Sequence, residues 1–425
     1  MKRLFTVFTH CALSLFCLSA ALTQVAQAQT FRVLYTFSNG PDGATPFSGV
    51  TIDRAGNLYG TAEQGGKLAC DPPFGCGTAY RLKPSGSNFT FGVLYSFAGG
   101  ADGSRPESRV IFGPDGALYG TTNEGGGGQC GPVGCGTVYK LVPRGAAFCR
   151  STSCPWAETV LYAFNGDSDG YWPLFADLLF DQARNIYGTT PYTTSGLGIY
   201  GVVYELTPTD HGYTQTILHS FSGGDGSQPN SGVISDDAGN LYGTTEAGGL
   251  YGYGTVYELT NVPGTGWTET VLHNFNAYDG SNITAGLISD QSGNLYGAAS
   301  IGGNYGGGTV FELTPGAGGW TFNVLYNFPQ CGPQSSLTMD AAGNLYGAIL
   351  CGGANNAGAV FKLASSNGSW TYTSLHDFNY TDGDNPWGSV TMDSSGNLYG
   401  TTIYGGNYSG LCQHDGCGVV WKITP

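Results

Sequence analysis

One short segment recurs seven times along this chain of 425 residues and constrains its fold more than any other feature. Its consensus is Gly-Asn-Leu-Tyr-Gly-Thr-Thr, as at residues 239–245. Successive copies lie 50 to 68 residues apart, by subtraction of their positions. The tyrosines of the seven copies are Tyr59, Tyr119, Tyr187, Tyr242, Tyr296, Tyr346 and Tyr399. A period of this length with strand-forming content indicates a β-propeller or another repeat array.

Each repeat contains four segments with the composition of β-strands. The first reads Val-Leu-Tyr-x-Phe (residues 93–97), and the second is short (residues 50–53). The third is the Leu-Tyr-Gly-Thr-Thr segment, and the fourth reads Gly-Thr-Val-Tyr-Glu-Leu (residues 254–259). Val, Tyr, Phe, Thr and Ile dominate these segments, and turn-forming residues bound them. With no long apolar pattern at helical spacing, the chain is predicted to be all-β, a seven-bladed β-propeller of four-stranded antiparallel blades.

The order of the strands within a blade follows from their composition. Gly49, Gly232 and Gly286 each precede a short second segment, which fits the crowded axis where the blades converge. Val-Leu-Tyr-x-Phe is then the outermost strand. The chain begins on such an outermost strand and ends on a fourth segment. We therefore predict that residues 31–37 complete the blade built from about 387–424, which closes the ring and leaves no free sheet edge.

The first 28 residues have the pattern of a secretory signal peptide. Lys2 and Arg3 precede a mostly apolar run, and Ala26-Gln27-Ala28 offers small residues at the spacing for cleavage. A retained membrane anchor is the alternative, but polar residues interrupt the run and it is short for a span. We predict cleavage after residue 28, which leaves residues 29–425 as a single seven-repeat domain in the periplasm or the medium.

The charge of the chain narrows the classes of partner. Loss of Lys2 and Arg3 changes the formal net charge from −15 to −17. Nucleic acids and anionic membranes attract basic surfaces, so we expect neither as a partner. The remaining candidates are a glycan or an extracellular protein, bound by a monomer.

Ten cysteines lie after residue 28, and they fall into pairs that are close in the sequence. An even number of cysteines in an exported chain favours disulfide bonds. Zinc binding is the alternative, but the spacings are not those of a zinc site. The predicted disulfides are Cys70–Cys76, Cys130–Cys135, Cys149–Cys154, Cys331–Cys351 and Cys412–Cys417.

The propeller places two sets of loops on one face. These are the loops that lead into the second segment and the loops between the third and fourth segments. Cys331 lies in a loop of the first kind and Cys351 in the following loop of the second kind, so the fold brings them together. Three further disulfides close loops of this disulfide-pinned face, whereas Cys149–Cys154 would close a hairpin on the opposite face.

Carboxylates recur on the same face in an Asp-Gly dipeptide. A ring of them beside a central channel could bind Ca²⁺, a cation that prefers oxygen ligands. The alternative is turn formation, since Asp-Gly is a common turn dipeptide and no loop has the dense acidic pattern of a dedicated calcium site. We expect no other cofactor. The candidate metal ligands are Asp42, Asp102, Asp169, Asp225, Asp279 and Asp382.

Departures from the repeat mark further candidate residues. Where most repeats have a small residue before the second segment, Arg109 and Asp177 stand in consecutive repeats. We expect them to line the channel as an ion pair, with a ligand-orienting role as the alternative. His414, beside Asp415 in the loop of Cys412 and Cys417, is the histidine to test for function. Three other histidines replace the Tyr of Val-Leu-Tyr-x-Phe and are interpreted as packing residues: His219, His273 and His376.

The combined signature, Gly-Asn-Leu-Tyr-Gly-Thr-Thr followed by Gly-Gly and Gly-Thr-Val-Tyr/Phe-Glu/Lys-Leu, resembles the bacterial GloVer tandem repeat of choice-of-anchor secreted proteins. The resemblance covers nearly all of residues 31–425 and implies an exported repeat protein, with no catalytic residues to carry over. The chain has no catalytic triad, zinc-helix or phosphate-loop motif. We therefore predict a non-enzymatic scaffold that binds glycan or protein through the disulfide-pinned face. The alternatives are a polysaccharide hydrolase or lyase with acidic residues at the channel mouth, and a purely structural envelope protein.

Overall fold

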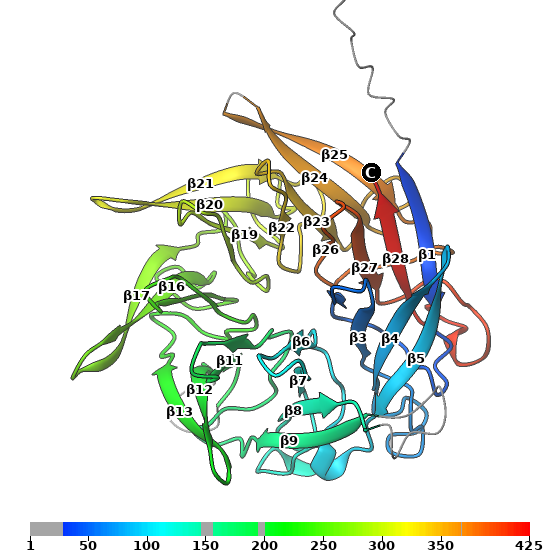
Figure 1. The fold of residues 1–425 in the computed structure, drawn as a ribbon. Helices are drawn as coiled ribbons and strands as arrows, with labels where there is room; N and C mark the ends of the chain where they lie inside the picture. The colour runs from blue at the N-terminus through cyan, green and yellow to red at the C-terminus, as the bar shows by residue number, and fades with distance from the viewer. Residues whose placement is uncertain (1–28, 146–155, 194–199, 367) are drawn as a thin grey trace, which may run out of the picture.

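The computed structural model describes residues 29–145, 156–193, 200–366 and 368–425. The described chain forms seven four-stranded antiparallel sheets arranged around one axis (Figure 1). The predicted seven-bladed propeller is therefore confirmed. The predicted signal peptide, residues 1–28, lies outside the described residues, as do Cys149 and Cys154.

The strand order within each blade is the predicted one. In each of blades 1 to 6, four consecutive strands lie in chain order from the axis outwards, beginning with β2–β5 in blade 1 and ending with β22–β25 in blade 6. In blade 7 the order from the axis outwards is β26-β27-β28-β1. The innermost strands are β2 (Thr51–Ile52), β6 (Ile111–Phe112), β10 (Leu179–Phe180), β14 (Ile234–Ser235), β18 (Ile288–Ser289), β22 (Thr338–Met339) and β26 (Thr391–Met392). The second strands are β3 (Leu58–Ala62), β7 (Leu118–Thr122), β11 (Ile186–Thr190), β15 (Leu241–Thr245), β19 (Leu295–Ala299), β23 (Leu345–Ile349) and β27 (Leu398–Thr402).

The two outer strands of a blade form its long hairpin. The third strands are β4 (Thr78–Ser85), β8 (Thr137–Val142), β12 (Val202–Thr209), β16 (Thr255–Val262), β20 (Thr309–Gly316), β24 (Ala359–Ser366) and β28 (Val419–Thr424). The outermost strands are β5 (Asn88–Ser96), β9 (Ala157–Ala163), β13 (Gly212–Ser220), β17 (Gly266–Asn274), β21 (Gly319–Asn327), β25 (Ser369–Asp377) and β1 (Thr30–Thr36). Helical structure in the described residues is limited to the 3-10 turns η1 (Gly100–Asp102), η2 (Gly131–Val133) and η3 (Gly410–Cys412).

The two ends of the described chain close the ring. β1 pairs antiparallel with β28, with Phe31 opposite Ile423 and Thr36 opposite Val419 (Figure 1). Strand β1 thereby becomes the outermost strand of blade 7, as the sequence predicts. This pairing satisfies backbone groups that an open ring would leave as a sheet edge.

The consensus Leu-Tyr-Gly-Thr-Thr is a packing motif of the second strand. Its Gly lies under a large ring of the third strand: a Cβ on Gly243 would lie 2.3 Å from the Tyr257 hydroxyl oxygen, so no larger residue fits. The first Thr after this Gly donates its hydroxyl to a backbone carbonyl of the next blade at 2.8–3.1 Å. This contact occurs at Thr61, Thr121, Thr189, Thr244 and Thr401. One short motif therefore serves both the core of its own blade and the contact with the next.

The Asp that opens the turn between the first two strands of a blade is held by that turn. Asp53 accepts hydrogen bonds from the backbone N–H of Ala55 and Asn57, from the Asn57 side chain and from the Tyr59 hydroxyl. Burial alone would raise the pKa of this carboxyl, but these hydrogen bonds outweigh burial and lower it. Turn chemistry therefore explains this repeated carboxylate.

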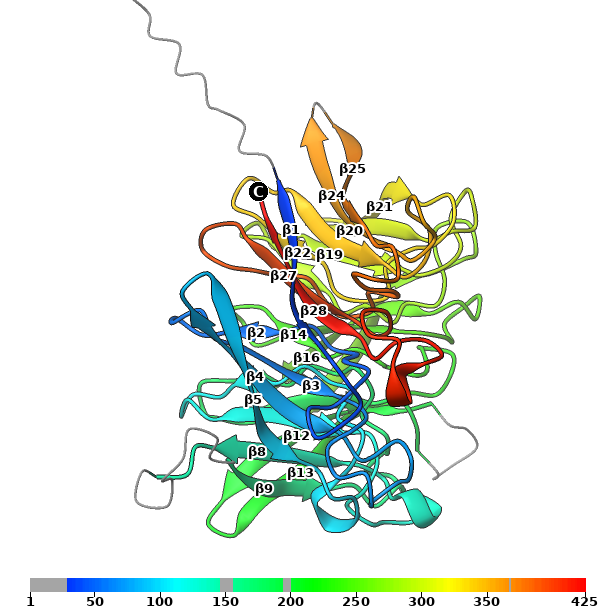
Figure 2. The same ribbon diagram turned by 90° about the vertical axis from the view of Figure 1, so that its right-hand side faces the viewer.

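The predicted loop sets share one face. In six blades a bridge joins the loop that leads into the innermost strand to the loop after the second strand, as between Ala44 and Gln64, and in blade 6 the bridge from Pro333 reaches Ile349, the last residue of the second strand. The structure forms the disulfides Cys70–Cys76, Cys130–Cys135, Cys331–Cys351 and Cys412–Cys417, with Cα–Cα separations of 5.2–6.0 Å. Figure 2 views the ring from its edge and shows the β4–β5 hairpin and the loop that contains η3 projecting from opposite sides. Among the described residues, no helix is both long and apolar enough to cross a membrane.

Candidate functional site

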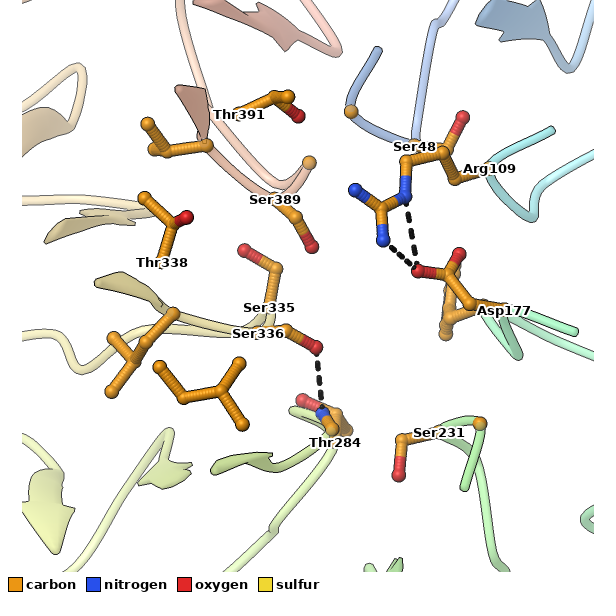
Figure 3. Close-up of a pocket in the computed structure, with 18 of the residues that line it drawn as sticks. Ser48, Arg109, Asp177, Ser231, Thr284, Ser335, Ser336, Thr338, Ser389 and Thr391 are labelled. Atoms are coloured by element: carbon orange, nitrogen blue, oxygen red, sulfur yellow. Dashed lines mark hydrogen bonds and ion pairs between the residues drawn. The ribbon is translucent and has the colours of Figure 1, made fainter. Parts of the chain in front are cut away.

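A cavity of about 400 Å³ lies on the axis of the ring, where the innermost strands converge (Figure 3). All seven blades contribute to its lining. Hydroxyl groups are frequent on its wall, and Figure 3 shows the side chains of Ser335 and Ser389 pointing into the same space. The hydroxyl-bearing residues of the lining are Ser48, Ser231, Thr284, Ser335, Ser336, Thr338, Ser389 and Thr391. The cavity thus has the size of a small-ligand site and many hydrogen-bonding groups.

Small residues before the innermost strands let the blades meet at this axis. A Cβ on Gly49 would lie 2.1 Å from the carbonyl oxygen of Ser389, which belongs to blade 7. A Cβ on Gly232 would lie equally close to the carbonyl oxygen of Asp177 in blade 3. Both contacts are too short for any side chain. The crowding that the sequence suggested is therefore present.

Arg109 and Asp177 meet at the wall of this cavity. The Arg109 Nε donates to Asp177 Oδ2 at 3.0 Å, and a second guanidinium nitrogen contacts the same oxygen (Figure 3). The two side chains are 28% and 29% exposed, so the pair faces the cavity without being enclosed. This ion pair between blades 2 and 3 is the one expected from the sequence.

Three aromatic side chains meet at the end of the cavity on the disulfide-pinned face. Phe47, Phe175 and Trp387 precede the innermost strands of blades 1, 3 and 7, and their ring centroids lie 5.6–5.8 Å apart. All three line the cavity, and each is only partly buried. We call these three residues the aromatic trio. The trio is not recognisable from the sequence, because its members come from distant repeats and align with Glu, Asn, Thr or Gln in the other four.

An acidic residue lines the cavity beside the trio. Glu107 occupies in blade 2 the position that Phe47 has in blade 1 and is 7% exposed. Its carboxylate accepts a hydrogen bond of 3.2 Å from the Asn123 amide. Burial, followed by the nearby charge of Glu63, raises the pKa of Glu107. The raised pKa favours the protonated form of Glu107, in which the carboxyl group can donate a hydrogen bond.

An arginine of the same loop, two residues before Glu107, contacts two further carboxylates. The Arg105 guanidinium lies 3.2 Å from Glu63 Oε1 and 3.3 Å from Glu124 Oε2. Glu63 is 6% exposed, and burial raises its pKa despite the opposing charge of Arg105. Nothing in the sequence distinguishes Glu63 from the other acidic residues that follow the second strands. The structure distinguishes it by its burial and its ionic partner.

The six Asp-Gly carboxylates lie apart from the axis, each in its own loop. Each accepts a hydrogen bond of 2.8–3.2 Å from the Tyr or His at the end of an outermost strand, as between Tyr35 and Asp42. Asp42 also accepts from the backbone N–H of Ser38 and Gly40, which closes the turn. Among the described residues that line the central cavity, none is one of these six. Turn formation accounts for their contacts, and calcium binding stays a prediction, to be checked by the melting temperature in the presence of a chelator.

The structure places His414 on an exposed loop next to η3. It lies within the loop closed by Cys412–Cys417, as expected, and at the outer part of the disulfide-pinned face rather than among the residues of the central cavity. A role for His414 in ligand binding stays a prediction.

A family model decides the relationship of this chain to known proteins. The model of the Gloeobacter/Verrucomicrobia repeat matches residues 21–155 and 238–425, which together are most of the sequence. The chain belongs to this repeat family. The resemblance read from the repeat signature is thereby confirmed. No curated protein sequence matches the chain.

Solved structures resemble the fold of this chain at low sequence identity. A polysaccharide lyase of family PL25, an ulvan lyase, has a TM-score of 0.52 at 12% identity, with 88% of this chain and 90% of that chain covered. A putative 6-phosphogluconolactonase from Bacteroides uniformis has a TM-score of 0.49 at 14% identity, with 77% and 83% covered. A putative glucose dehydrogenase from Thermus thermophilus has a TM-score of 0.41 at 16% identity, with 75% and 96% covered. These similarities concern the fold, because one propeller architecture hosts many unrelated functions.

Proposed function

We propose that this protein is a secreted, non-enzymatic scaffold that binds a glycan at the mouth of its central cavity. The observation that carries the proposal is the aromatic trio above a cavity lined with hydroxyl groups. A sugar ring presents an apolar face and an edge of hydroxyls. The aromatic rings can stack on the apolar face of the sugar, and the Ser, Thr and ion-paired groups of the wall can form hydrogen bonds with its hydroxyls.

The surrounding loops support a preformed site. Four disulfides close loops on the face where the trio lies. A loop that is already held in its binding conformation loses less entropy when the ligand binds, so affinity improves. Disulfide bonds also indicate an oxidising compartment, which agrees with export by the predicted signal peptide. We infer that the partner is a neutral or basic glycan, because a chain of formal net charge −17 after loss of Lys2 and Arg3 repels acidic polymers.

The test uses the oxidised chain from residue 29 onwards on a glycan array, followed by calorimetry with the best oligosaccharide. Trp387→Ala removes one ring of the trio and is expected to weaken binding about tenfold, the equivalent of roughly 1.4 kcal/mol for a lost stacking partner. Tyr278→Ala is the matched control: Tyr278 is an aromatic residue of the same face, is 81% exposed and is not part of the cavity lining. Equal affinity in the wild type and Trp387→Ala would overturn the proposal.

Glu107 favours one alternative function, an enzyme that acts on polysaccharide. A protonated carboxyl group beside an aromatic pocket can act as a general acid on a glycosidic oxygen. Glu63 is a second buried carboxyl in the same pair of blades. Incubation of the array hits with wild-type protein and with Glu107→Gln separates the two functions. Release of sugar products by the wild type and its loss in Glu107→Gln would support the enzyme, whereas binding without turnover in both supports the scaffold.

A further inference from the structure

A second polar constellation lies away from the central cavity, at the rim of the ring. His219 is on β13, the outermost strand of blade 3, and Asp225 is in the loop that follows this strand. Glu269 is on β17, the outermost strand of blade 4. One imidazole nitrogen and one oxygen of each carboxylate lie within 4.8 Å of one another. We call the contact between two consecutive blades a seam, so this group lies at the seam of blades 3 and 4.

Two of the three side chains are already oriented. The His219 Nε2 lies 3.0 Å from Asp225 Oδ2. The other carboxylate oxygen of Asp225 accepts hydrogen bonds from the backbone N–H and the hydroxyl of Ser222. Hydrogen bonds of this kind, made by atoms that do not contact a metal, orient metal ligands in proteins. The third side chain, Glu269, has an Oε1 atom that is buried from solvent and has no hydrogen-bond partner among the described residues.

The two other seams that have a histidine show what this position holds when it is only a packing site. At the seam of blades 4 and 5, His273 contacts Asp279 in the same way, but Phe322 stacks on its ring at 3.7 Å. At the seam of blades 6 and 7, the residues are His376, Asp382 and a stacked Phe31 at 3.5 Å. The interpretation of the histidines as packing residues therefore fits these two seams. The seam of blades 3 and 4 differs because a carboxylate stands where the others have an apolar ring.

We propose that His219, Asp225 and Glu269 bind a divalent transition-metal ion of the Zn²⁺ class. An imidazole nitrogen and carboxylate oxygens are common ligands of Zn²⁺, and three protein ligands leave a fourth tetrahedral position for water. The 3.0 Å separation of His219 and Asp225 is already that of neighbouring ligands around one ion, so a small rotation of Glu269 completes the set. The ion would give the orphaned Glu269 oxygen a partner and join blades 3 and 4. The side chains of His219 and Asp225 are 19% and 22% exposed, which leaves the site open to an ion from solvent.

The test measures Zn²⁺ binding to the metal-free, oxidised protein by calorimetry at pH 7.5, together with the melting temperature. The wild type is expected to bind one ion at this site and to melt at a higher temperature with Zn²⁺, because a ligand that binds only the folded state stabilises it. Glu269→Phe rebuilds the seam of blades 4 and 5, so it is expected to fold. Substitution of groups that merely orient a metal ligand costs about 10–100-fold in affinity, and loss of a ligand is expected to cost at least as much.

Two further variants make each outcome decisive. Glu269→Gln keeps the size of the side chain and removes its charge, and it is expected to weaken binding as Glu269→Phe does. His273→Tyr changes the equivalent histidine of a packing seam and is expected to leave Zn²⁺ affinity unchanged. Absence of binding by the wild type would overturn the proposal. So would equal affinity in the wild type, Glu269→Gln and Glu269→Phe, which would place the ion at exposed histidines such as His414.

Discussion

The seams on the two sides of blade 4 both place a His–Asp pair at the end of an outermost strand, and they differ in the residue of the next blade that faces this pair. On one side His219 and Asp225 face Glu269, and on the other His273 and Asp279 face Phe322. The His–Asp hydrogen bond is 3.0 Å long in the first case and 3.2 Å in the second. The repeat therefore supplies a His–Asp pair at both seams, and the residue contributed by the next blade decides between a stacked core and a polar site. In a repeat protein of this kind, a polar site forms where one repeat has a polar residue at a position that packs an apolar ring in other repeats.

The largest effect is expected when the packing seam is converted into the polar one. Phe322→Glu removes a ring that stacks on His273 and contacts Phe275 and Phe311. Without metal, the free energy of unfolding is expected to fall by about 2–4 kcal/mol, since aromatic burial is lost. Zn²⁺ is expected to recover part of this loss by binding the new set of ligands. Urea denaturation with and without Zn²⁺ measures both changes.

The control for this conversion comes from another seam of the same chain. Gln215 occupies the equivalent position at the seam of blades 2 and 3, so Phe322→Gln introduces a side chain that this fold already accepts. It loses the stacking and supplies no carboxylate. An equal response of Phe322→Gln and Phe322→Glu to Zn²⁺ would show that the carboxylate does not bind the ion, and the comparison of the seams would lose its chemical meaning.

A smaller effect is expected at the seam of blades 1 and 2, where a carboxylate faces a tyrosine instead of a histidine. Glu158 faces Tyr95 and Asp102 at the seam of blades 1 and 2, and its buried Oε1 has no hydrogen-bond partner among the described residues. Burial, followed by the charge of Asp102, raises the pKa of Glu158 from 4.5 to about 7. The folded state then binds more protons than the unfolded state between these values. The contribution of Glu158 to stability is therefore full below pH 4.5 and is lost as the pH rises to about 7.

Glu158→Gln removes this dependence on pH. Relative to the variant, the wild type is expected to lose about 1 kcal/mol between pH 5 and pH 8, a value reduced for solvent screening because the side chain is half-buried. Denaturation curves at both pH values measure the difference. A constant difference between the two proteins across this range would show that Glu158 ionises as it does in the unfolded chain.

The smallest effect is expected when the core of blade 4 is made like the core of blade 5, the blade that it meets at the packing seam. Tyr257 in blade 4 and Phe311 in blade 5 are both fully buried over the Gly of the second strand. The Tyr257 hydroxyl has no hydrogen-bond partner among the described residues. Tyr257→Phe therefore removes a desolvated polar group without leaving a partner behind, and stability is expected to stay unchanged or rise by up to about 1 kcal/mol. Thermal unfolding measures this change, and a clear loss of stability would reveal a partner for the hydroxyl.

Much of the fold could be predicted because its determinants recur. The strand segments, the blade number, the closure by β1 and the pairing of Cys331 with Cys351 all follow from one pattern repeated seven times. The contact between Arg109 and Asp177 also followed, because both residues break the pattern at the same position in adjacent repeats. An exception to a known repeat has a known place in the fold, so its neighbours can be inferred.

The aromatic trio and the group at the rim could not be predicted in this way. Phe47 and Trp387 are far apart in the sequence and meet only because the ring closes. Glu269 lies 50 residues after His219, by subtraction of their positions, and nothing in either repeat marks the two as neighbours. Contacts across a seam depend on the register and twist of two outermost strands, which the pattern within one repeat does not specify.

The sequence by itself thus determined the repeat unit, the propeller and the four cysteine pairs that lie within the described residues, because hydrophobic periodicity and turn chemistry act over short distances along the chain. Tertiary structure alone decided which side chains of different blades share a pocket or a seam. These contacts form when seven twisted sheets pack around one axis and the ring closes. The physical reason is that packing joins residues by their position on the ring, whatever their separation in the chain.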